Sequence, residues 1–172
     1  VYADSPPTVR WVVRASTNPT GATSVNYTVG FTESVTGVDI TDFTLDTNGV
    51  DGATVSSVSG SGASYTVAVN SGVGSGTLRL NISDNNSIVD VVGNPLGGSG
   101  VQNFIAGQTY TLDKTAPITR WVVRASANPS VAGSVDYKVG FTETVTGVDA
   151  SDFRVSGIAD ALVASVIGSG AG

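Results

Sequence analysis

The fold class is decided by the stretch Ser24-Val-Asn-Tyr-Thr-Val-Gly-Phe-Thr-Glu33. Its large apolar residues, at positions 25, 27, 29 and 31, alternate with polar or small ones, which is the period of a half-buried β-strand. Similar alternation continues on both sides, between turns rich in glycine, asparagine and proline. It predicts seven strands, around 9–15, 25–31, 43–45, 55–58, 65–69, 78–82 and 110–112. Seven short strands at this spacing indicate an all-β, immunoglobulin-like β-sandwich with antiparallel strands.

The same stretch occurs again as Ser134-Val-Asp-Tyr-Lys-Val-Gly-Phe-Thr-Glu143, at an offset of 110 residues. Residues 10–16 recur at the same offset. The second copy is only half present, because its match to the first stops at 168–171, which correspond to 60–63. A period of this length is typical of a sandwich domain. The predicted division is an N-terminal segment or linker at 1–7, a first repeat at 8–117 that includes an exit linker at 113–117, and the first half of a second repeat at 118–172.

A half sandwich leaves the hydrophobic face of its strands without cover. Two explanations stay open. The chain is part of a longer array of repeats, or strands from another chain complete the second sandwich by strand addition. The second explanation would make the protein a subunit that forms polymers.

The composition of the 172 residues argues against several classes of function. Cys and His are absent, so the chain by itself forms no disulfide, thiol nucleophile or Ser-His-Asp triad. The net charge of −6 and the lack of a basic cluster argue against nucleic-acid binding. No apolar run is long enough to span a bilayer. We therefore expect a protein that is not an enzyme, binds no nucleic acid and has no membrane span.

Four carboxylates near predicted strand ends form a candidate metal site: Glu33, Asp84, Asp90 and Asp113. Glu33 is expected in a loop at the end of a strand, and asparagines accompany Asp84 and Asp90. Calcium takes six to eight oxygen ligands from such groups. A calcium ion held by these four residues at one end of the sandwich would stiffen the junction between repeats. The alternative is that they are solvated turn residues, which bond to their own backbone.

A pair of aspartates, Asp39 and Asp42, recurs as Asp149 and Asp152. Two neighbouring acids could serve in glycoside hydrolysis, but catalytic pairs are rarely duplicated in each repeat. We favour a turn, or the cap of a short helical turn.

Trp11 stands between Arg10 and Arg14, and this group recurs at 120–124. An indole exposed beside arginines could stack on a sugar or form a cation–π pair. Strict alternation instead places Trp11 on the same face as Val9, which predicts burial in the core or at a junction between domains.

The stretch Val29-Gly-Phe-Thr-Glu-Ser-Val-Thr-Gly-Val-Asp-Ile-Thr-Asp-Phe43 resembles the bacterial immunoglobulin-like (Big-type) repeats of large surface proteins. Asp90-Val-Val-Gly-Asn-Pro-Leu96 and Tyr110-Thr-Leu-Asp-Lys-Thr-Ala-Pro117 resemble them too. The resemblance covers essentially all of residues 8–172. It implies secretion, extension in tandem and often calcium at domain junctions.

Together these features predict an extracellular structural module, a rigid spacer or stalk of a bacterial adhesin, surface layer or filament. Its expected partners are neighbouring repeats or identical subunits, with surface glycans as a further option. Two alternatives stay open: a self-assembling fibre subunit, and a carbohydrate-binding module of a secreted protein.

Overall fold

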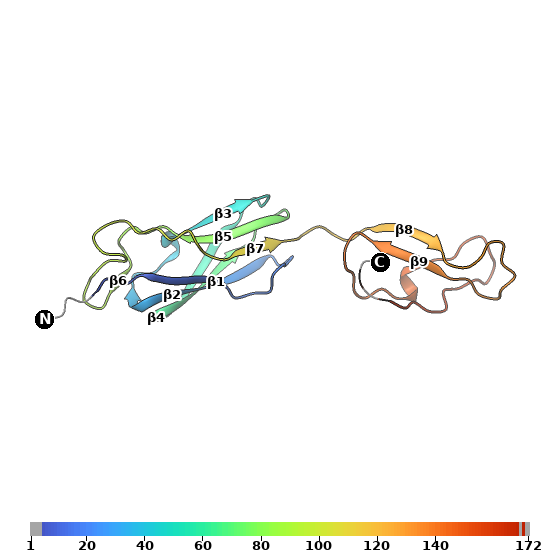
Figure 1. Cartoon of the computed structure of the whole chain (residues 1–172), viewed down its shortest axis with the longest axis horizontal. Coiled ribbons are helices and arrows are strands. Elements are labelled where there is room, and N and C mark those ends of the chain that lie inside the picture. Colours follow the sequence, from blue (N-terminus) through green and yellow to red (C-terminus); the bar gives the residue numbers. More distant parts are fainter. Residues whose placement is uncertain (1–4, 169, 171–172) are drawn as a thin grey trace. The chain divides into compact units, whose positions relative to one another are not determined.

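The computed structural model describes residues 5–168 and 170 of the chain. It is built from antiparallel β-sheets with two short 3-10 helices, which confirms the predicted all-β class. The chain divides into two compact units, Val1–Thr115 and Ala116–Gly172 (Figure 1). The first four residues of the predicted N-terminal segment lie outside the described residues.

The first unit contains two sheets that pack around a shared core (Figure 1). One sheet has the order β1-β2-β4, with β6 also paired to β2, and the other has the order β3-β5-β7. All pairings between these strands are antiparallel. Their bounds are β1 (Val9–Arg14), β2 (Ser24–Thr36), β3 (Phe43–Asn48), β4 (Thr54–Asn70), β5 (Gly76–Ile82), β6 (Val89–Asp90) and β7 (Thr109–Leu112).

The strands agree with the predicted ones, except that β2 runs on to Thr36 and that two other places differ. The predicted strands 55–58 and 65–69 are the two arms of β4, which folds back on itself. Gly60 and Gly62 allow this turn because both have positive φ, 129° and 67°, and the Ser56 hydroxyl donates to the Ala68 carbonyl at 2.9 Å. The two-residue strand β6 was not predicted, because it is too short to show a period.

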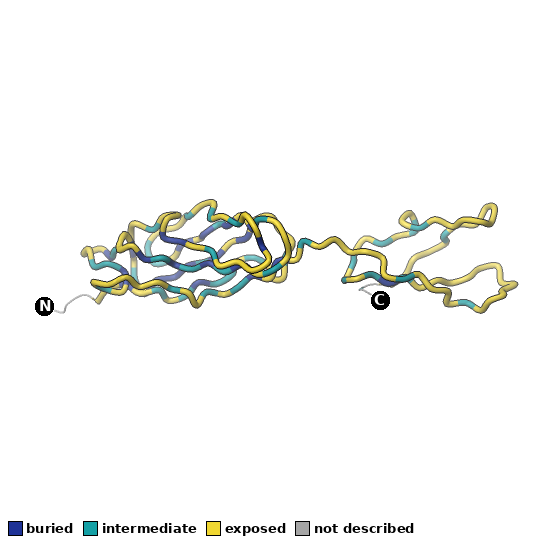
Figure 2. Tube along the Cα trace, turned by 90° about the horizontal axis from the view of Figure 1, so that it is seen from above, coloured by how far each residue is buried: buried dark blue, intermediate teal, exposed yellow. Residues whose placement is uncertain are grey.

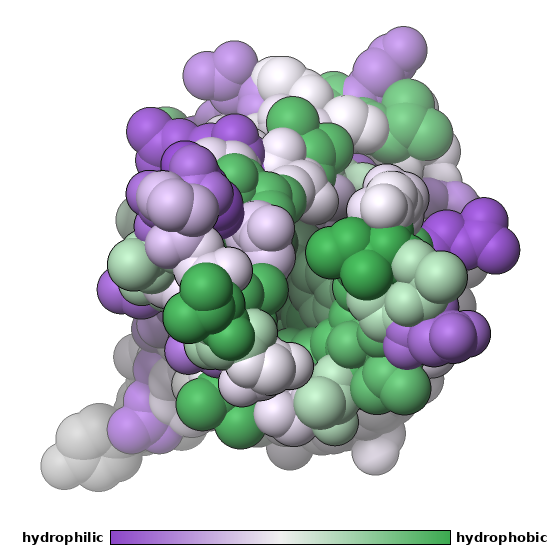
Figure 3. Space-filling model, turned by 90° about the vertical axis from the view of Figure 1, so that its right-hand side faces the viewer, coloured by the Kyte–Doolittle hydropathy of each residue, from purple (hydrophilic) through white to green (hydrophobic). Residues whose placement is uncertain are grey.

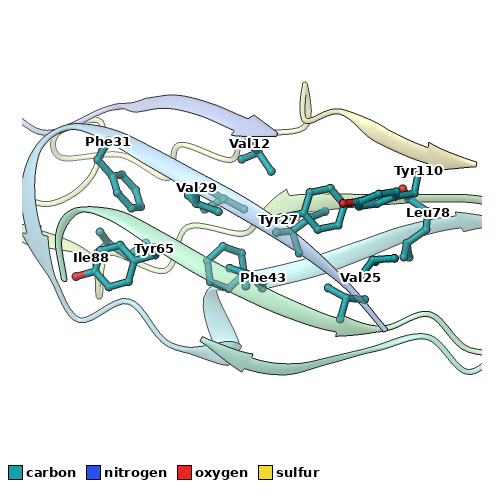
Figure 4. Packing of buried hydrophobic residues seen from close by; sticks show 14 of the residues in the cluster. Val12, Val25, Tyr27, Val29, Phe31, Phe43, Tyr65, Leu78, Ile88 and Tyr110 are labelled. Atoms are coloured by element: carbon teal, nitrogen blue, oxygen red, sulfur yellow. The ribbon is translucent and has the colours of Figure 1, made fainter. Parts of the chain in front are cut away.

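The core of the first unit forms between the alternating apolar residues of β2 and those of the opposite sheet (Figure 4). Val25, Tyr27 and Val29 are almost fully buried, as their alternation predicts. The Tyr27 hydroxyl donates to the Leu78 carbonyl at 2.8 Å, which links β2 to β5 across the core. The Tyr27 ring also meets the Tyr110 ring edge to face, with centroids 5.0 Å apart. Aromatic pairs of this geometry add to the stability that burial supplies.

The face that β1 turns to the core differs from the prediction. Val12 is buried at 2% exposure, whereas Trp11 is only half-buried. The pairing of β1 with β2 shifts register between Val9 and Trp11, which marks a β-bulge. A bulge inserts one extra residue and so reverses the inward and outward positions that follow it. The prediction of Trp11 on the core face was therefore wrong, because strict alternation assumes a regular strand.

The second unit repeats the first from β1 to η1, although its second strand is shorter. Strand β8 (Thr119–Arg124) pairs with β9 (Tyr137–Phe141) in the register of β1 and β2, including the bulge. The 3-10 helix η2 (Ala150–Asp152) likewise matches η1 (Ile40–Asp42). Beyond η2, residues 153–168 form no strand. Figure 2 shows buried positions concentrated in the first unit and few in the second.

Candidate functional site

The paired aspartates cap the short helices that follow β2 and β9. In the first unit, the Asp39 carboxylate accepts a hydrogen bond from the Thr41 N–H at 2.7 Å, and the Asp42 carboxylate accepts from the Asp39 N–H at 2.7 Å. The second unit repeats this reciprocal capping box with Asp149 and Asp152. The predicted role as a helix cap is confirmed.

Asp42 is fully buried and connects its helix to the long loop after β5. Its second carboxylate oxygen accepts from the Ser87 hydroxyl at 2.7 Å. Burial raises the pKa of Asp42, against the opposing effect of its hydrogen bonds. The pKa of the exposed Asp39 is lowered by the Thr41 hydroxyl and N–H. These two acids therefore differ in environment, and each is engaged in local structure.

Asp84 lies in the same loop, and Asp90, in β6, organises the turn that follows that strand. Asp84 accepts from the N–H groups of Asn86 and Gln102, both at 2.8 Å. Asp90 accepts from the N–H groups of Val92 and Asn94 and from the Asn94 side-chain amide, at 2.8–2.9 Å. Burial of the Asp90 carboxylate tends to raise its pKa, but these hydrogen bonds together outweigh burial and lower the pKa. Both carboxylates are buried, at 5% and 3% exposure, so they are not solvated, but they do bond to the backbone of their own turns, as the alternative interpretation expects.

The four predicted calcium ligands do not come together. Asp84 lies two residues after Ile82, the last residue of β5, whereas Asp113 follows Leu112, which pairs with Gly76 at the start of β5. The length of that strand separates the two acids by roughly 20 Å. Glu33 lies within β2 rather than in a loop. No group of three or more potential metal-binding side chains is found among residues 5–168 and 170.

The exit from the first unit is fixed by Lys114, which sequence reasoning did not identify. Its ammonium group donates to the Ser71 hydroxyl at 2.9 Å, to the Ser71 carbonyl at 3.3 Å and to the Gly72 carbonyl. The Lys114 N–H donates to the Ser75 hydroxyl at 2.8 Å, and Asp113 accepts from the Thr115 N–H at 3.1 Å. The linker is therefore anchored on the first unit as far as Thr115. A lysine in a polar linker gives no sequence signal for such a role.

Trp11 lies on the outer face of the first sandwich, directly over Gly30 of β2. A Cβ atom on Gly30 would come within 2.2 Å of the Trp11 indole. The Arg10 guanidinium lies 4.8 Å from the centroid of the indole ring. Trp121 and Gly140 repeat the indole contact in the second unit. Because the indole rests on the glycine, one of its faces is used for packing within the sheet.

The second unit has an exposed apolar face, whereas the equivalent residues of the first unit are covered by that unit's own second sheet. We define this open face as Val122, Val135, Tyr137, Val139, Phe141 and Phe153, the counterparts of six core residues of the first unit. Tyr137 is 58% exposed, whereas Tyr27 is fully buried. Val122 and Val135 are exposed at 57% and 49%, against 2% and 1% for their counterparts. Nearly identical sequences thus differ in burial because of what packs against them.

The open face borders a hollow of about 530 Å³ lined in part by Phe141, Val145, Val148 and Phe153. Figure 3 shows a hollow in the surface whose rim is formed in part by hydrophobic groups, with weakly polar groups between them. An apolar surface of this kind usually marks a site of interaction with another polypeptide. It is the strongest candidate site on the described part of the chain.

Among the described residues, no helix combines the length and the apolar character required to traverse a bilayer. Comparisons of the chain with models of protein families, with curated proteins and with solved structures found no match.

Proposed function

We propose that the chain is a structural repeat module that acts as a rigid spacer in an extracellular bacterial protein, such as an adhesin, a surface layer or a filament. The duplicated sequence supports this proposal, since a unit copied in tandem builds length. The strand order also supports it. With the arms of β4 counted separately, it is compatible with the constant-type immunoglobulin sandwich that we propose. The buried aspartates hold loops in place, which suits a structural role.

The observation that carries the proposal is the anchoring of the exit linker by Lys114. A spacer transmits position only if its linkers resist bending, and a polar linker without contacts would behave as a flexible coil. Lys114 makes hydrogen bonds to Ser71 and Gly72 just after β4, so the first part of the linker, as far as Thr115, is held on the sandwich.

Spin labels can test the stiffness of this linker. The chain has no cysteine, so exposed Thr44 in β3 and exposed Thr119 in β8 can be replaced by cysteine and labelled selectively. If the chain is a rigid spacer, we expect one narrow distribution of distances between the labels. Lys114→Ala should broaden this distribution, because it removes the hydrogen bonds that hold the linker. Lys138→Ala, which removes an exposed lysine of β9, serves as the matched control and is expected to leave the distribution unchanged. A broad distribution in the unaltered chain would contradict the proposal.

A self-assembling fibre subunit is the second candidate function, and the open face of the second unit favours it. In this case strands of a neighbouring chain would complete the second sandwich. Light scattering after size exclusion, with calcium and with a chelator, separates the two functions. Polymers that grow with protein concentration indicate a fibre subunit, and their loss in chelator would assign a role to calcium at the junctions. A monomer under all conditions supports the spacer.

A further inference from the structure

Much of the β1-β2-β4 sheet of the first unit is free of acidic side chains. The chain has 14 aspartates and glutamates and a net charge of −6. None of these acids lies within 5–32 or within 54–70, the ranges that contain β1, most of β2 and both arms of β4. The first range contains two cations, Arg10 and Arg14. This sheet is therefore the part of an acidic protein that repels an anionic partner least.

Arg10 is the cation of the first unit whose side chain is not engaged by an acceptor. Among residues 5–115 the other three cations, Arg14, Arg79 and Lys114, donate to a carbonyl, a carboxylate and a hydroxyl. The exposed Arg10 guanidinium instead contacts the Trp11 ring, and in the same described range it has no carboxylate partner. Its N–H donors are therefore available to a ligand.

Trp11 holds this guanidinium in place. Arg10 lies over the indole ring, 4.8 Å from its centroid, and the indole itself rests on Gly30. A guanidinium that stacks on an aromatic ring keeps its edge free to donate hydrogen bonds. Arg10 is thus an exposed cation in a defined position, and its planar fork fits a carboxylate through two parallel hydrogen bonds.

Short polar side chains lie on the same outer face of the sheet. Trp11 pairs with Gly30, which pairs with Ser64, and in the next row Thr28 pairs with Thr66. Asn26, Ser64 and Thr66 are exposed and Thr28 is half-buried, in alternation with buried core residues. We call this set the Arg10 face: Arg10, Trp11, Asn26, Thr28, Ser64 and Thr66. Its hydroxyl and amide groups both donate and accept hydrogen bonds, as the hydroxyl groups of a sugar require.

We propose that the Arg10 face binds an acidic polysaccharide, one whose sugars carry carboxylates. Arg10 holds a carboxylate, and the hydroxyl and amide groups of Asn26, Ser64 and Thr66 bond to the hydroxyl groups of the sugar. Trp11 is a positioning residue, which acts through Arg10. This binding activity goes beyond the spacer function and does not depend on it.

The same face fits an acidic polypeptide less well. Interfaces between proteins usually have a core of large apolar side chains that enter pockets of the partner. On the Arg10 face the indole is already engaged by Gly30 and Arg10. The apolar neighbour of Thr28 on β1, Val13, is itself half-buried. Most of the remaining groups are hydroxyls, which match a partner rich in hydroxyls.

The test is a titration of the isotopically labelled full chain with the trisaccharide of galacturonic acid, followed by NMR. We expect the signals of the Trp11 indole N–H, the Asn26 side-chain amide and the amides of 26–30 and 64–68 to shift. These signals report on the first unit alone, so the Arg120 copy in the second unit does not affect the dissociation constant that they give.

Arg10→Ala should weaken this binding by at least about tenfold, because it removes a charge-assisted pair of hydrogen bonds. Arg154→Ala is the matched control. It removes the same charge from an exposed arginine of the second unit and should leave the affinity of the first unit unchanged. Since Arg10 is exposed, the other amide signals should keep their positions in Arg10→Ala, which shows that the variant is folded.

Two further ligands identify what the face recognises. The methyl ester of the same trisaccharide lacks the charges, and a triglutamate peptide with blocked ends has the carboxylates without the sugar. Each should bind at least about tenfold more weakly than the trisaccharide, because each lacks one of the two sets of hydrogen bonds.

Four results would overturn the proposal. The trisaccharide produces no shifts on the Arg10 face, or Arg10→Ala binds it as tightly as the Arg154→Ala control does. The methyl ester binds as tightly as the acid, which would mean that the charge is not recognised. Triglutamate binds at least as tightly as the trisaccharide, which would make an acidic polypeptide the partner. None of these results alters the label distances across Lys114, so the spacer function is tested separately.

Discussion

Asp42 and Asp152 occupy the same place in two copies of one capping motif, but their surroundings differ. Asp42 is fully buried and also accepts a hydrogen bond from Ser87, whereas Asp152 is exposed. The counterpart of Ser87 would lie in the half of the repeat that the second copy lacks. The local cap is therefore a property of the motif, and burial is a property of its environment.

We expect Asp42→Ala to destabilise the first unit by about 2 kcal/mol, because it leaves the Ser87 hydroxyl and the Asp39 N–H without their acceptor in a buried site. Asp152→Ala removes only an exposed cap and should cost less than about 1 kcal/mol. Equilibrium urea unfolding of the two variants measures the difference. If both variants lose the same free energy of unfolding, burial adds nothing to the contribution of Asp42.

At the scale of the element, the bulge in β1 explains why Trp11 points outward. It places the indole over Gly30, and the same pairing of tryptophan with glycine recurs between β8 and β9. The glycine is required by close approach, since any Cβ atom on it would overlap the ring.

Gly30→Ala should therefore destabilise the first unit by about 1–3 kcal/mol, the usual cost of overpacking. The double variant Trp11→Ala with Gly30→Ala should lose less than the sum of the two single changes, because the overlap is gone. Thermal unfolding of the four chains measures this coupling. Gly100→Ala, at a site with no atom within 4 Å of the added Cβ, is the control and should change little. Additive losses would contradict the packing of Trp11 on Gly30.

At the scale of the whole molecule, the nearly identical segments 27–31 and 137–141 lie in different surroundings, the first in a two-layer unit and the second in a unit with one pair of strands. Tyr27-Thr-Val-Gly-Phe31 lies between two neighbouring strands and under a second sheet. Tyr137-Lys-Val-Gly-Phe141 pairs with one strand, and its tyrosine is 58% exposed.

We expect the backbone amides of 137–141 to exchange at least about tenfold faster than those of 27–31 in the unaltered chain, because stability against local opening follows buried contacts. Hydrogen exchange followed by mass spectrometry compares the two segments in a single sample. Similar exchange in both, at low protein concentration, would mean that the second unit is stable without a partner.

Sequence reasoning predicted the strands wherever a regular alternation continued over several residues, as in β2 and β5. It failed at the bulge next to Trp11, because one extra residue changes the facing of those that follow. It also grouped Asp84 with Asp113, which stand at opposite ends of β5. Acidic residues at strand ends look alike in sequence, and only the path of the chain decides which end each one occupies.

The sequence by itself determined the β period, the duplication and the capping motifs, because these depend on residues that are close together in the chain. The tertiary structure alone decided how far each strand extends and which apolar residues are covered. Residues 24–36 and 134–146 are almost the same sequence, yet the first forms one long strand and the second a short one. A strand persists only where another strand accepts its hydrogen bonds and another layer covers its apolar side chains, and those partners come from distant parts of the chain.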